Sequence, residues 1–527
     1  MNRRYFLRSA AASALAAPLA HALPARAMQP GAIQPGATQP LTITLNGNAA
    51  TKPVPRSFIG LSYELAQLTE PAFFSKENHG LIAAFHQLSP QGVLRLGGNS
   101  SEFCWFQDSP STPAPKLHVP TGNISANWMP HRLFAISPQA VDNLAGFLDA
   151  TGWQVIYGVN FGNSSPERAA VEAAYAAKRL GSHLIFFQIG NEPDFYRDSN
   201  NGTRPAGWDF PDYAREWLAF ARAIAAAVPG ARFGGPDVGA SSDWITRFAA
   251  EVAPQLGDSL VAVTGHYYAE GPPDDPRVTS TRLLAGNPAV RKDTEAVVAA
   301  AEAHHLVYRM TEGNSCYRGG KPGMSNAFAS SLWAGDYLLE LASLGCAGVN
   351  LHGGDSRFLT ASLGDHTPGR DVAKGHETRS GGFYTPIDSE LNQPVRLMPI
   401  AYGMLIAQQF AGATMLETSL QTEANITAYA ARTAKGYLVA VFNKDESTAA
   451  DLAIALPADA APRATAWRLE GPALDATTGI TLAGASLDLQ QKWAPRHIEK
   501  VQVRGSSARI HLSAASAALV FLESFPR

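Results

Sequence analysis

Two glutamates directly follow mostly apolar runs of the sequence, where a charged side chain is unusual. Glu192 follows the apolar run FFQIG in the stretch FFQIGNEPDFY, and Glu312 follows the run VYRMT. Because an unpaired carboxylate is costly to bury, each is exposed, matched to a counter-charge or used in chemistry. Two carboxyl groups that face one substrate can cleave a glycosidic bond, since one protonates the leaving oxygen while the other attacks the anomeric carbon.

The elements that would position these glutamates alternate regularly along the chain. Short apolar segments are separated by amphipathic helical segments, a pattern typical of parallel strands joined by crossover helices. Eight strands are expected, over residues 58–64, 93–98, 154–161, 186–192, 233–238, 262–268, 307–313 and 348–354. Eight such units predict an α/β fold, a (β/α)8 TIM barrel, whose active site lies at the carboxyl ends of the strands.

The helices between these strands have recognisable ends. One begins at Ser137, carries Pro138 in its first turn and stops before Gly152, and the segment 165–181 repeats the arrangement. Serine is a good N-cap, proline fits the first turn, and glycine tolerates the left-handed conformation that ends a helix. These signals support the alternation of strands and helices.

The barrel gives the two glutamates a shared location. Glu192 ends the fourth predicted strand and Glu312 the seventh, so both side chains are expected at the same mouth. A single glutamate at a strand end is otherwise a salt-bridge partner or a loop cap. Finding both at strand ends of one barrel favours the catalytic interpretation.

A second domain is expected after the barrel. Beyond about residue 411 the sequence changes to alternating β-type runs separated by glycine, proline, alanine and aspartate. We predict a catalytic barrel over 57–411 and a smaller antiparallel β-sandwich over 412–527. The segment 41–56 has the same alternating character, and we assign it to the sandwich.

The first residues have the features of an export signal. Arg3 and Arg4 precede an Ala/Leu-rich stretch that ends in an A-x-A site at Ala27, and a spacer rich in Gln-Pro-Gly follows over 28–40. The alternative is a membrane anchor, but the apolar run is too short and too weakly hydrophobic to span a bilayer. We therefore expect a twin-arginine signal over 1–27, export to the periplasm or medium, and no stable membrane insertion.

Composition excludes several classes of function. The formal net charge is −3, and the first 27 residues hold four arginines and no acidic residue, so the mature chain is more acidic. Such a chain is a poor nucleic-acid binder. Three cysteines make no disulfide framework, and no His, Cys and Asp cluster has metal-ligand spacing. We expect no cofactor and no metal.

Sequence blocks along the chain form one pattern. They are FIGLSYEL, GVLRLGGNSSEF, FFQIGNEPD, GHYY, MTEGNSCYRGG, GFYTPID and, in the second domain, YLVAVFNKD. Together they resemble glycoside hydrolase family 79 of clan A, the β-glucuronidases and heparanases. The resemblance runs from about residue 41 to the C-terminus and is nearest to bacterial exo-acting β-glucuronidases.

The resemblance implies catalytic roles for four residues. Glu192 would be the general acid/base and Glu312 the nucleophile of a retaining mechanism. Asn191 would hydrogen-bond the sugar 2-hydroxyl, and Tyr268 would hold Glu312 through its phenol. For Tyr268 the alternative is packing at the barrel rim.

Recognition of the sugar carboxylate is also implied. In the family, a tyrosine and backbone N–H groups after the nucleophile grip this group, together with a tyrosine after strand eight. They correspond here to Tyr317, Gly319, with Gly320 as its neighbour, and Tyr384. The alternative for the segment RGGKPG is a plain flexible turn, and its Arg318 and Lys321 would add charge attraction.

Three further polar residues line the predicted mouth. Glu64 matches a family residue that contacts sugar hydroxyls, with a surface ion pair as the alternative. Arg95 is expected beneath the nucleophile, where it would keep the nucleophile ionised, and His352 is expected in the pocket wall. Either of the last two is otherwise a satisfied structural residue. The polar loop over 355–381 is longer than expected for the family.

The sequence thus predicts a retaining β-glucuronidase, exo-acting, whose substrate is a glucuronic acid-containing glycoside or oligosaccharide. One alternative is an endo-acting, heparanase-like enzyme. Another is a clan A enzyme for a neutral sugar, a xylosidase or arabinofuranosidase, which would keep both glutamates. A non-catalytic carbohydrate-binding protein is the alternative from a different class.

Overall fold

The computed structural model describes residues 40–118, 126–197, 202–370 and 382–525. The signal expected over 1–27 and nearly all of the spacer over 28–40 lie outside them, as does the end of the 355–381 loop. Residues Leu41–Arg527 form one compact unit. Among the described helices, none has the length and apolar character needed to cross a bilayer.

Eight parallel strands close into a barrel. Their order is β10-β11-β2-β3-β6-β7-β8-β9, and β9 pairs with β10 to complete the ring. Their bounds are β2 Ile59–Glu64, β3 Val93–Gly97, β6 Gln154–Val159, β7 Leu184–Ile189, β8 Phe233–Val238, β9 Leu260–Glu270, β10 Val307–Cys316 and β11 Val349–Gly353. Each predicted strand overlaps one of these, so the predicted TIM barrel is confirmed.

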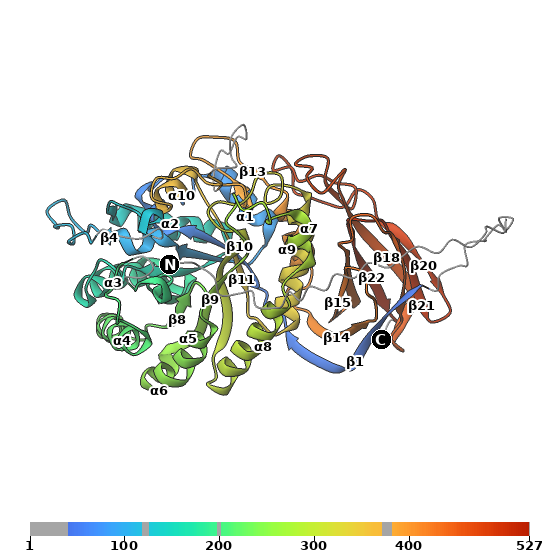
Figure 1. The fold of residues 1–527 in the computed structure, drawn as a ribbon, viewed down its shortest axis with the longest axis horizontal. Coiled ribbons are helices and arrows are strands. Elements are labelled where there is room, and N and C mark those ends of the chain that lie inside the picture. The colour runs from blue at the N-terminus through green and yellow to red at the C-terminus, as the bar shows by residue number, and fades with distance from the viewer. Residues whose placement is uncertain (1–39, 119–125, 198–201, 371–381, 526–527) are drawn as a thin grey trace, which may run out of the picture. The chain divides into compact units, whose positions relative to one another are not determined.

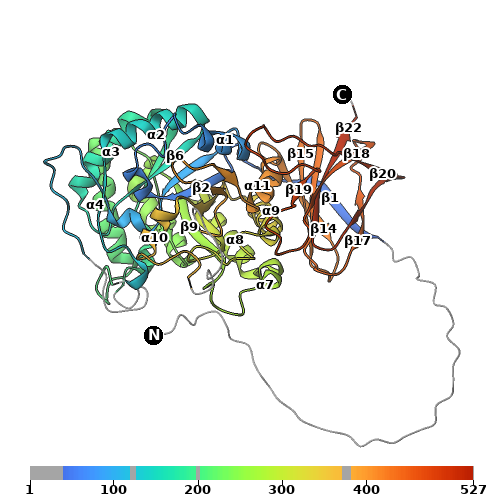
Figure 2. The same ribbon diagram turned by 90° about the horizontal axis from the view of Figure 1, so that it is seen from above.

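Helices lie around the outside of the barrel (Figures 1 and 2). Their bounds are α1 His79–Leu88, α2 Pro138–Thr151, α3 Pro166–Leu180, α4 Phe210–Ala227, α5 Ser242–Arg247, α6 Ala253–Leu256, α7 Ser280–Ala285, α8 Pro288–Ala303, α9 Phe328–Ser343, α10 Ser356–Ser362 and α11 Ile400–Gln408. The predicted caps of α2 are present: Ser137 Oγ accepts the Ala140 N–H at 3.3 Å, and Gly152 has φ 70°.

The second structural element is a ten-stranded sheet. Its strands are β1 Leu41–Pro53, β14 Thr414–Leu420, β15 Ile426–Thr433, β16 Gly436–Asn443, β17 Ala450–Ala455, β18 Ala460–Glu470, β19 Thr481–Leu482, β20 Glu499–Arg504, β21 Ser507–Leu512 and β22 Ser516–Ser524. Their order is β19-β18-β20-β21-β17-β1-β14-β15-β16-β22, and β18 also pairs with β22. The sheet therefore folds back on itself around its own apolar core.

Strand β1 joins the two ends of the chain, as expected. In Figure 1 its blue ribbon lies among the red and orange C-terminal strands. It pairs antiparallel with β14 but parallel with β17. The predicted sandwich thus contains one parallel pair, because β1 enters between two strands that run in opposite directions.

The sheet packs on the barrel through α9. Asp336 on α9 accepts hydrogen bonds from Thr427 and from the Tyr429 hydroxyl at 2.8 Å, and Lys444 Nζ lies 2.5 Å from its second oxygen. The Asp336 and Lys444 side chains are only 14% and 5% exposed. A nearly buried ion pair therefore sits at the junction of barrel and sheet.

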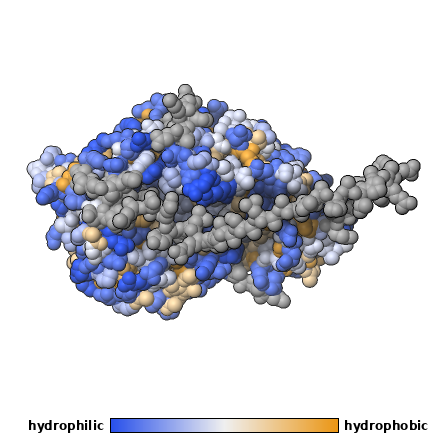
Figure 3. All heavy atoms as spheres, in the orientation of Figure 1, coloured by the Kyte–Doolittle hydropathy of each residue, from blue (hydrophilic) through white to orange (hydrophobic). Residues whose placement is uncertain are grey.

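The surface carries small, separate hydrophobic areas. Figure 3 shows one face, where hydrophilic residues dominate the coloured surface. Large hydrophobic side chains that are at least half exposed occur on separate segments: Val171, Val307, Ile498 and Phe525. Single exposed apolar residues of this kind are normal, so they do not indicate a docking surface.

Candidate active site

Glu192 follows β7 through a sharp change of backbone direction. The strand ends at Ile189, earlier than predicted, and Gly190 and Glu192 take φ values of 86° and 48°. The Glu192 N–H donates to the Asp237 carbonyl at 2.8 Å and thereby fixes the turn. A non-glycine residue in this conformation is uncommon and is frequently found at functional sites. The Glu192 side chain is 22% exposed, within reach of a ligand.

Glu312 lies on β10 with both carboxylate oxygens engaged. The Tyr268 hydroxyl donates to Oε1 at 2.8 Å, and Arg95 Nη1 donates to Oε2 at 2.5 Å. His352 Nδ1 lies 3.7 Å from Oε2. The side chain is 8% exposed, so its charge is balanced inside the barrel mouth rather than by water.

The two glutamates converge. One carboxylate oxygen of Glu192, one of Glu312 and one ring nitrogen of His266 lie within 4.8 Å of one another. Retaining glycosidases separate their carboxyl groups by about 5–5.5 Å and inverting ones by about 6.5–9.5 Å. The two carboxyl groups are therefore close enough to act on one glycosidic bond.

Arg95, on β3, is the centre of the network beneath this pair. Its guanidinium is fully buried. Besides Glu312, it donates to Gln188 Oε1 at 3.2 Å, Ser62 Oγ at 3.1 Å, Asn191 Oδ1 at 2.7 Å and Asp237 Oδ2. Burial lowers the pKa of Arg95, but the charges of Asp237 and Glu312 more than offset this and raise it. The guanidinium is a permanent cation below both glutamates.

His266, on β9, connects a buried carboxylate to Glu192. Its Nε2 lies 2.9 Å from Asp237 Oδ1, and its Nδ1 lies 3.1 Å from Glu192 Oε1. Burial lowers the pKa of His266, but the charges of Asp237 and Glu312 and the hydrogen bonds outweigh burial and raise it to about 10. The ring is therefore an imidazolium at neutral pH and donates from both nitrogens.

The pKa of Glu312 is held well below its usual range. Burial raises it, but the charges of His352, His266 and Arg95 and the hydrogen bond from Tyr268 lower it further than burial raises it. Glu312 is thus a carboxylate at any ordinary pH. The predicted position of Arg95 against Glu312 is confirmed by its contact with Oε2.

Asn191 is fixed from two sides. Because Arg95 can only donate, the Asn191 side-chain oxygen faces it, and the amide NH2 is left as a donor, 3.4 Å from Asn99 Oδ1. The Asn191 backbone N–H donates to Glu102 Oε1 at 2.7 Å. Asn191 is 3% exposed and therefore rigidly placed beside Glu192.

Three tyrosines form one wall of the site. The Tyr268 ring centroid lies 6.2 Å from that of Tyr384 and 6.5 Å from that of Tyr317. Tyr384 is 2% exposed, so the residue expected after strand eight reaches the site despite the long loop before it. The structure thus brings Tyr268, Tyr317 and Tyr384 together beside Glu312.

The loop after β10 bends through consecutive left-handed residues. Arg318, Gly319 and Gly320 have φ values of 58°, 86° and 83°. A Cβ on Gly319 would lie 2.4 Å from Pro368 Cβ, so a side chain is excluded there. The Gly319 carbonyl accepts the Phe383 N–H at 2.7 Å, which ties this loop to the segment before Tyr384. It is therefore a packed turn, not a flexible one.

The Lys321 side chain contacts the loop that follows β9. Its Nζ donates to the backbone carbonyls of Val278 at 2.6 Å and Asp275 at 3.2 Å. The ammonium group therefore holds the loop that follows β9. That Lys321 adds charge attraction to the site stays a prediction.

Glu64 lies at the edge of the network. Its Oε2 accepts from the Ser100 N–H at 2.9 Å and the Ser100 hydroxyl at 2.6 Å, and its Oε1 lies 3.3 Å from His352 Nε2. The side chain is 5% exposed. His352 thus links Glu64 to Glu312, so Glu64 is placed to orient His352 as well as to line the site.

Glu192, His266 and Glu312 also have the residue types of a metal site. Glu312 already binds Arg95 and Tyr268, and His266 is a cation that donates from both nitrogens. A divalent ion would repel these two positive charges. The trio is better explained as a network of ion pairs.

Sequence reasoning did not single out His266, Asp237 or Glu102. His266 and Asp237 lie within predicted strands six and five, near the ends where functional groups were expected. Their position was a usable signal, since buried polar residues at carboxyl ends of barrel strands face the site. Glu102 lies in the short 3-10 helix Asn99–Phe103 after β3, and its contact with Asn191 depends on the three-dimensional arrangement alone.

The fold and the site define a (β/α)8 barrel with an attached β-domain and a carboxylate pair at its mouth. This fold is shared with solved glycosidases. A 4-O-α-L-rhamnosyl-β-D-glucuronidase from Fusarium oxysporum superposes with a TM-score of 0.72 over 92% of this chain and all of that one, at 18% identity. A family 51 arabinofuranosidase from Xanthomonas axonopodis gives 0.62 over the same share, at 15% identity.

The sequence is similar to those of β-glucuronidases and a heparanase. A β-glucuronidase from Aspergillus niger is 26% identical over 58% of this chain, and one from Neurospora crassa is 24% identical over 59%. Chicken heparanase is 22% identical over 53%. Each match covers 60% of the relative's own length. No family model matches the chain.

Proposed function

We propose that this protein is a retaining glycosidase that releases β-linked glucuronic acid. The observation that carries the proposal is the pair Glu192 and Glu312, with oxygens within 4.8 Å and unlike surroundings. Glu312 is buried against Arg95, whereas Glu192 is partly exposed. The similarity to β-glucuronidases from two fungi supports the choice of sugar.

In the first step, the Glu312 carboxylate attacks the anomeric carbon. The bond from this carbon to Glu312 forms as the bond to the leaving oxygen breaks, and Glu192 gives its proton to that oxygen. In the second step, Glu192 takes a proton from water, the water oxygen attacks the same carbon, and the ester bond to Glu312 breaks. Both carboxyl groups return to their starting states.

The surrounding residues support the nucleophile and the sugar. Arg95 and Tyr268 orient Glu312 and keep it ionised, so the attacking oxygen is a carboxylate. The amide NH2 of Asn191 is a donor suited to the sugar 2-hydroxyl. His266 positions Glu192 through its Nδ1.

We assign recognition of the uronate carboxylate to Tyr317, Tyr384 and the backbone of Gly319. The tyrosine wall beside Glu312 and the left-handed turn at Gly319 support this assignment. Neutral O–H and N–H donors bind an anion without a basic side chain. An enzyme for a neutral sugar would need no such cluster, so glucuronate is preferred to xylose or arabinose.

We further propose that the chain is exported, since Arg3 and Arg4 begin a twin-arginine signal with an A-x-A site at Ala27. N-terminal sequencing of the exported protein should give Met28 as the first residue. Retention of Met1 in the exported fraction would contradict this proposal.

The test of the activity is a comparison of three nitrophenyl glycosides. We expect kcat/KM for the β-glucuronide to exceed that for the β-glucoside and β-xyloside by about 10³, roughly 4 kcal/mol of transition-state discrimination. The Glu312→Gln variant serves as control for background hydrolysis. Equal rates on all three substrates would be consistent with a glycosidase, but they would refute the proposal that the site recognises the uronate carboxylate.

A further inference from the structure

Three consecutive N–H groups in the turn over residues 190–192 have three different partners. The first and the last donate to backbone carbonyls on β6 and β8, at 3.0 Å and 2.8 Å. The middle one, of Asn191, donates to the carboxyl group of Glu102 at 2.7 Å. The residues on either side of Asn191 are left-handed, and such a turn persists only where its surroundings hold it. Of the three acceptors, Glu102 is the side chain, so a substitution can remove it.

The other oxygen of Glu102 holds the loop after β6. This oxygen, Oε2, accepts the Phe161 N–H at 3.0 Å and also the Gly162 N–H. A Cβ on Gly162 would lie 2.9 Å from Oε2, so glycine permits the close approach. Glu102 itself follows β3. One carboxyl group thus ties together the ends of β3, β6 and β7, which are neighbours in the barrel.

Glu102 is deeply buried, at 1% exposed. Burial raises its pKa, and its hydrogen bonds, including the one from the Asn191 N–H, lower the pKa only in part. A buried carboxyl group is costly unless hydrogen bonds compensate it. The backbone N–H groups supply this compensation, and in doing so they fix the loops to which they belong.

The direction of the Asn191 side chain depends on this backbone contact. Its oxygen accepts from Arg95 at 2.7 Å, whereas its NH2 lies at a longer distance, 3.4 Å, from Asn99 Oδ1. This NH2 is the donor assigned to the sugar 2-hydroxyl. Arg95 therefore holds the side chain at its oxygen, and Glu102 holds the residue at its backbone N–H.

We propose that Glu102 is a positioning residue for the reaction, which holds the Asn191 backbone so that the side-chain NH2 meets the sugar 2-hydroxyl in the transition state. Glu102 acts through Asn191 and not on the sugar directly. Loss of Glu102 should therefore reduce the contribution of the 2-hydroxyl in particular. This inference rests on the proposed function for its catalytic test.

The test compares nitrophenyl β-glucuronide with its 2-deoxy analogue, which lacks the hydroxyl that Asn191 binds. The measured quantity is the ratio of kcat/KM for the glucuronide to kcat/KM for the analogue, so effects common to both substrates cancel. Glu102→Gln keeps the size of the side chain but turns an NH2 toward backbone donors. In this variant the ratio should fall about 10-fold.

Glu102→Asp is the conservative variant. It keeps the carboxyl group on a shorter side chain and should recover part of the ratio. If Glu102→Gln does not fold, the same comparison in Glu102→Asp decides, with an expected fall of about 3-fold. An unchanged ratio in the folded variant, or an equal loss of kcat/KM on both substrates, would overturn the proposal.

A double-variant cycle shows whether the effect passes through Asn191. Asn191→Ala removes the NH2 donor and should lower the ratio by itself. Adding Glu102→Gln to Asn191→Ala should then leave the ratio unchanged. A second fall of similar size in the double variant would mean that Glu102 acts by another route, which would contradict the proposal.

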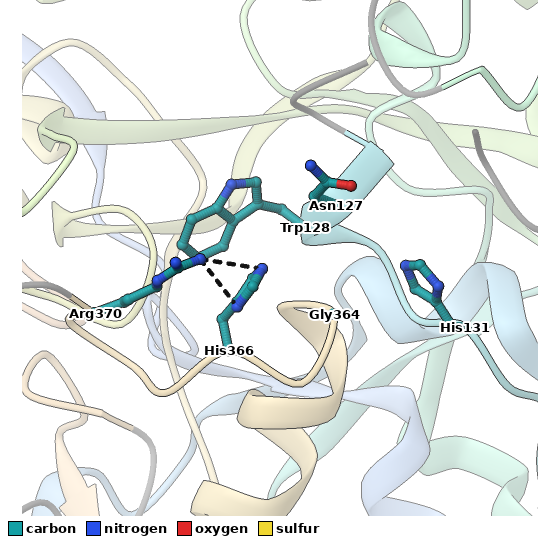
Figure 4. A pocket seen from close by; sticks show the side chains of 6 residues that line it. All are labelled: Asn127, Trp128, His131, Gly364, His366 and Arg370. Atoms are coloured by element: carbon teal, nitrogen blue, oxygen red, sulfur yellow. Dashed lines mark hydrogen bonds between the residues drawn. The ribbon is translucent and has the colours of Figure 1, made fainter. Parts of the chain in front are cut away.

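Two control variants lie away from the turn. Glu172→Gln changes another buried carboxyl group, on α3, which accepts from the Tyr157 hydroxyl at 3.0 Å. It should lower stability and leave the ratio unchanged. The second control, His131→Gln, alters the cavity of about 380 Å³ in Figure 4, whose lining includes neither Glu102 nor the turn. A fall in either control as large as in Glu102→Gln would refute a specific role of Glu102.

Hydrogen exchange separates this inference from the activity. If the native protein hydrolyses neither substrate, the proposed function fails, and exchange in the peptide that contains Asn191, measured by mass spectrometry, decides whether Glu102 holds the turn. Exchange of the Asn191 N–H should be about 10-fold faster in Glu102→Gln than in the native protein, and unchanged in Glu172→Gln. Exchange that neither variant alters, or that both alter equally, would reject the role of Glu102.

Discussion

Arg95 Nη1 and Glu312 Oε2 lie 2.5 Å apart, and both side chains are almost completely buried. The same guanidinium contacts Asp237, which also pairs with His266, and His266 in turn pairs with Glu192. The two glutamates are therefore joined through one buried network. Arg95 lies against Glu312 and keeps it ionised, whereas Glu192 pairs with His266 and is partly exposed, so the two glutamates have different surroundings.

Replacing Arg95 by lysine should lower kcat and change its pH dependence. Lysine keeps a charge but cannot reach Glu312, Asn191 and Asp237 together, so we expect a loss of about 10²–10³ in kcat. The pKa of Glu312 should rise, and since the carboxylate is the active form, the acidic limb of kcat/KM should move to higher pH. A pH–rate profile measures this shift.

The control for Arg95 is Arg309, a second buried arginine on a barrel strand, whose Nε donates to Asn350 Oδ1 at 2.8 Å. Arg309→Lys should lower stability and leave the acidic limb in place. An acidic limb that stays fixed in Arg95→Lys while kcat falls would mean that Arg95 shapes the site without tuning Glu312.

The two glutamates should respond differently to conversion to glutamine. Glu312→Gln removes the proposed nucleophile and should abolish turnover of every substrate. Glu192→Gln should cost about 10²–10⁴-fold with a poor leaving group and much less with a nitrophenolate, which needs no proton to depart. Comparing alkyl and nitrophenyl glucuronides measures the difference. Equal losses with both leaving groups would contradict the acid role of Glu192.

The barrel could be predicted because its signals are local. Eight apolar runs, serine caps and glycine stops each act over a few residues, and their alternation allows few folds. Glu192 and Glu312 could be paired in advance because the barrel brings all strand ends to one mouth. The parallel pairing of β1 with β17 could not be predicted, because it joins residues hundreds of positions apart.

The network around the glutamates was less predictable for the same reason. His266 gains its charge from Asp237 and Glu312, which lie on other strands, and no local pattern carries that information. The contacts of Lys321 could not be predicted either, because a basic residue next to a binding loop has no fixed direction, and here its ammonium group donates to the carbonyls of Asp275 and Val278.

Tyr268→Phe should lower kcat by about 10- to 100-fold, since it removes one hydrogen bond to a charged group and leaves the ring in place. The matched control is Tyr267→Phe on the same strand, whose ring stacks on Tyr337, 5.4 Å away, instead of facing Glu312. Both variants should unfold at similar temperatures. Equal kcat values for the two variants would show that Tyr268 does not position Glu312.

His266 should make stability depend on pH in the alkaline range. Its pKa is raised to about 10 in the folded protein and is about 6.5 when unfolded. Its contribution is therefore fully present below about pH 6.5 and is lost as the pH rises through about 10. The difference in melting temperature between the native protein and His266→Gln should shrink across this window in calorimetry. A constant difference would contradict a charged His266.

The ion pair between Asp336 and Lys444 should hold the sheet to the barrel. The side chains are 14% and 5% exposed, so Asp336→Ala leaves a charge nearly buried without its partner and should cost about 3–5 kcal/mol in urea unfolding. Asp336→Leu combined with Lys444→Met should recover much of that loss, because it removes both charges together. Arg463→Gln, at an exposed pair, should cost less than about 1 kcal/mol. A double variant as unstable as Asp336→Ala would show that hydrogen bonds from Thr427 and Tyr429, more than charge, make Asp336 necessary at this junction.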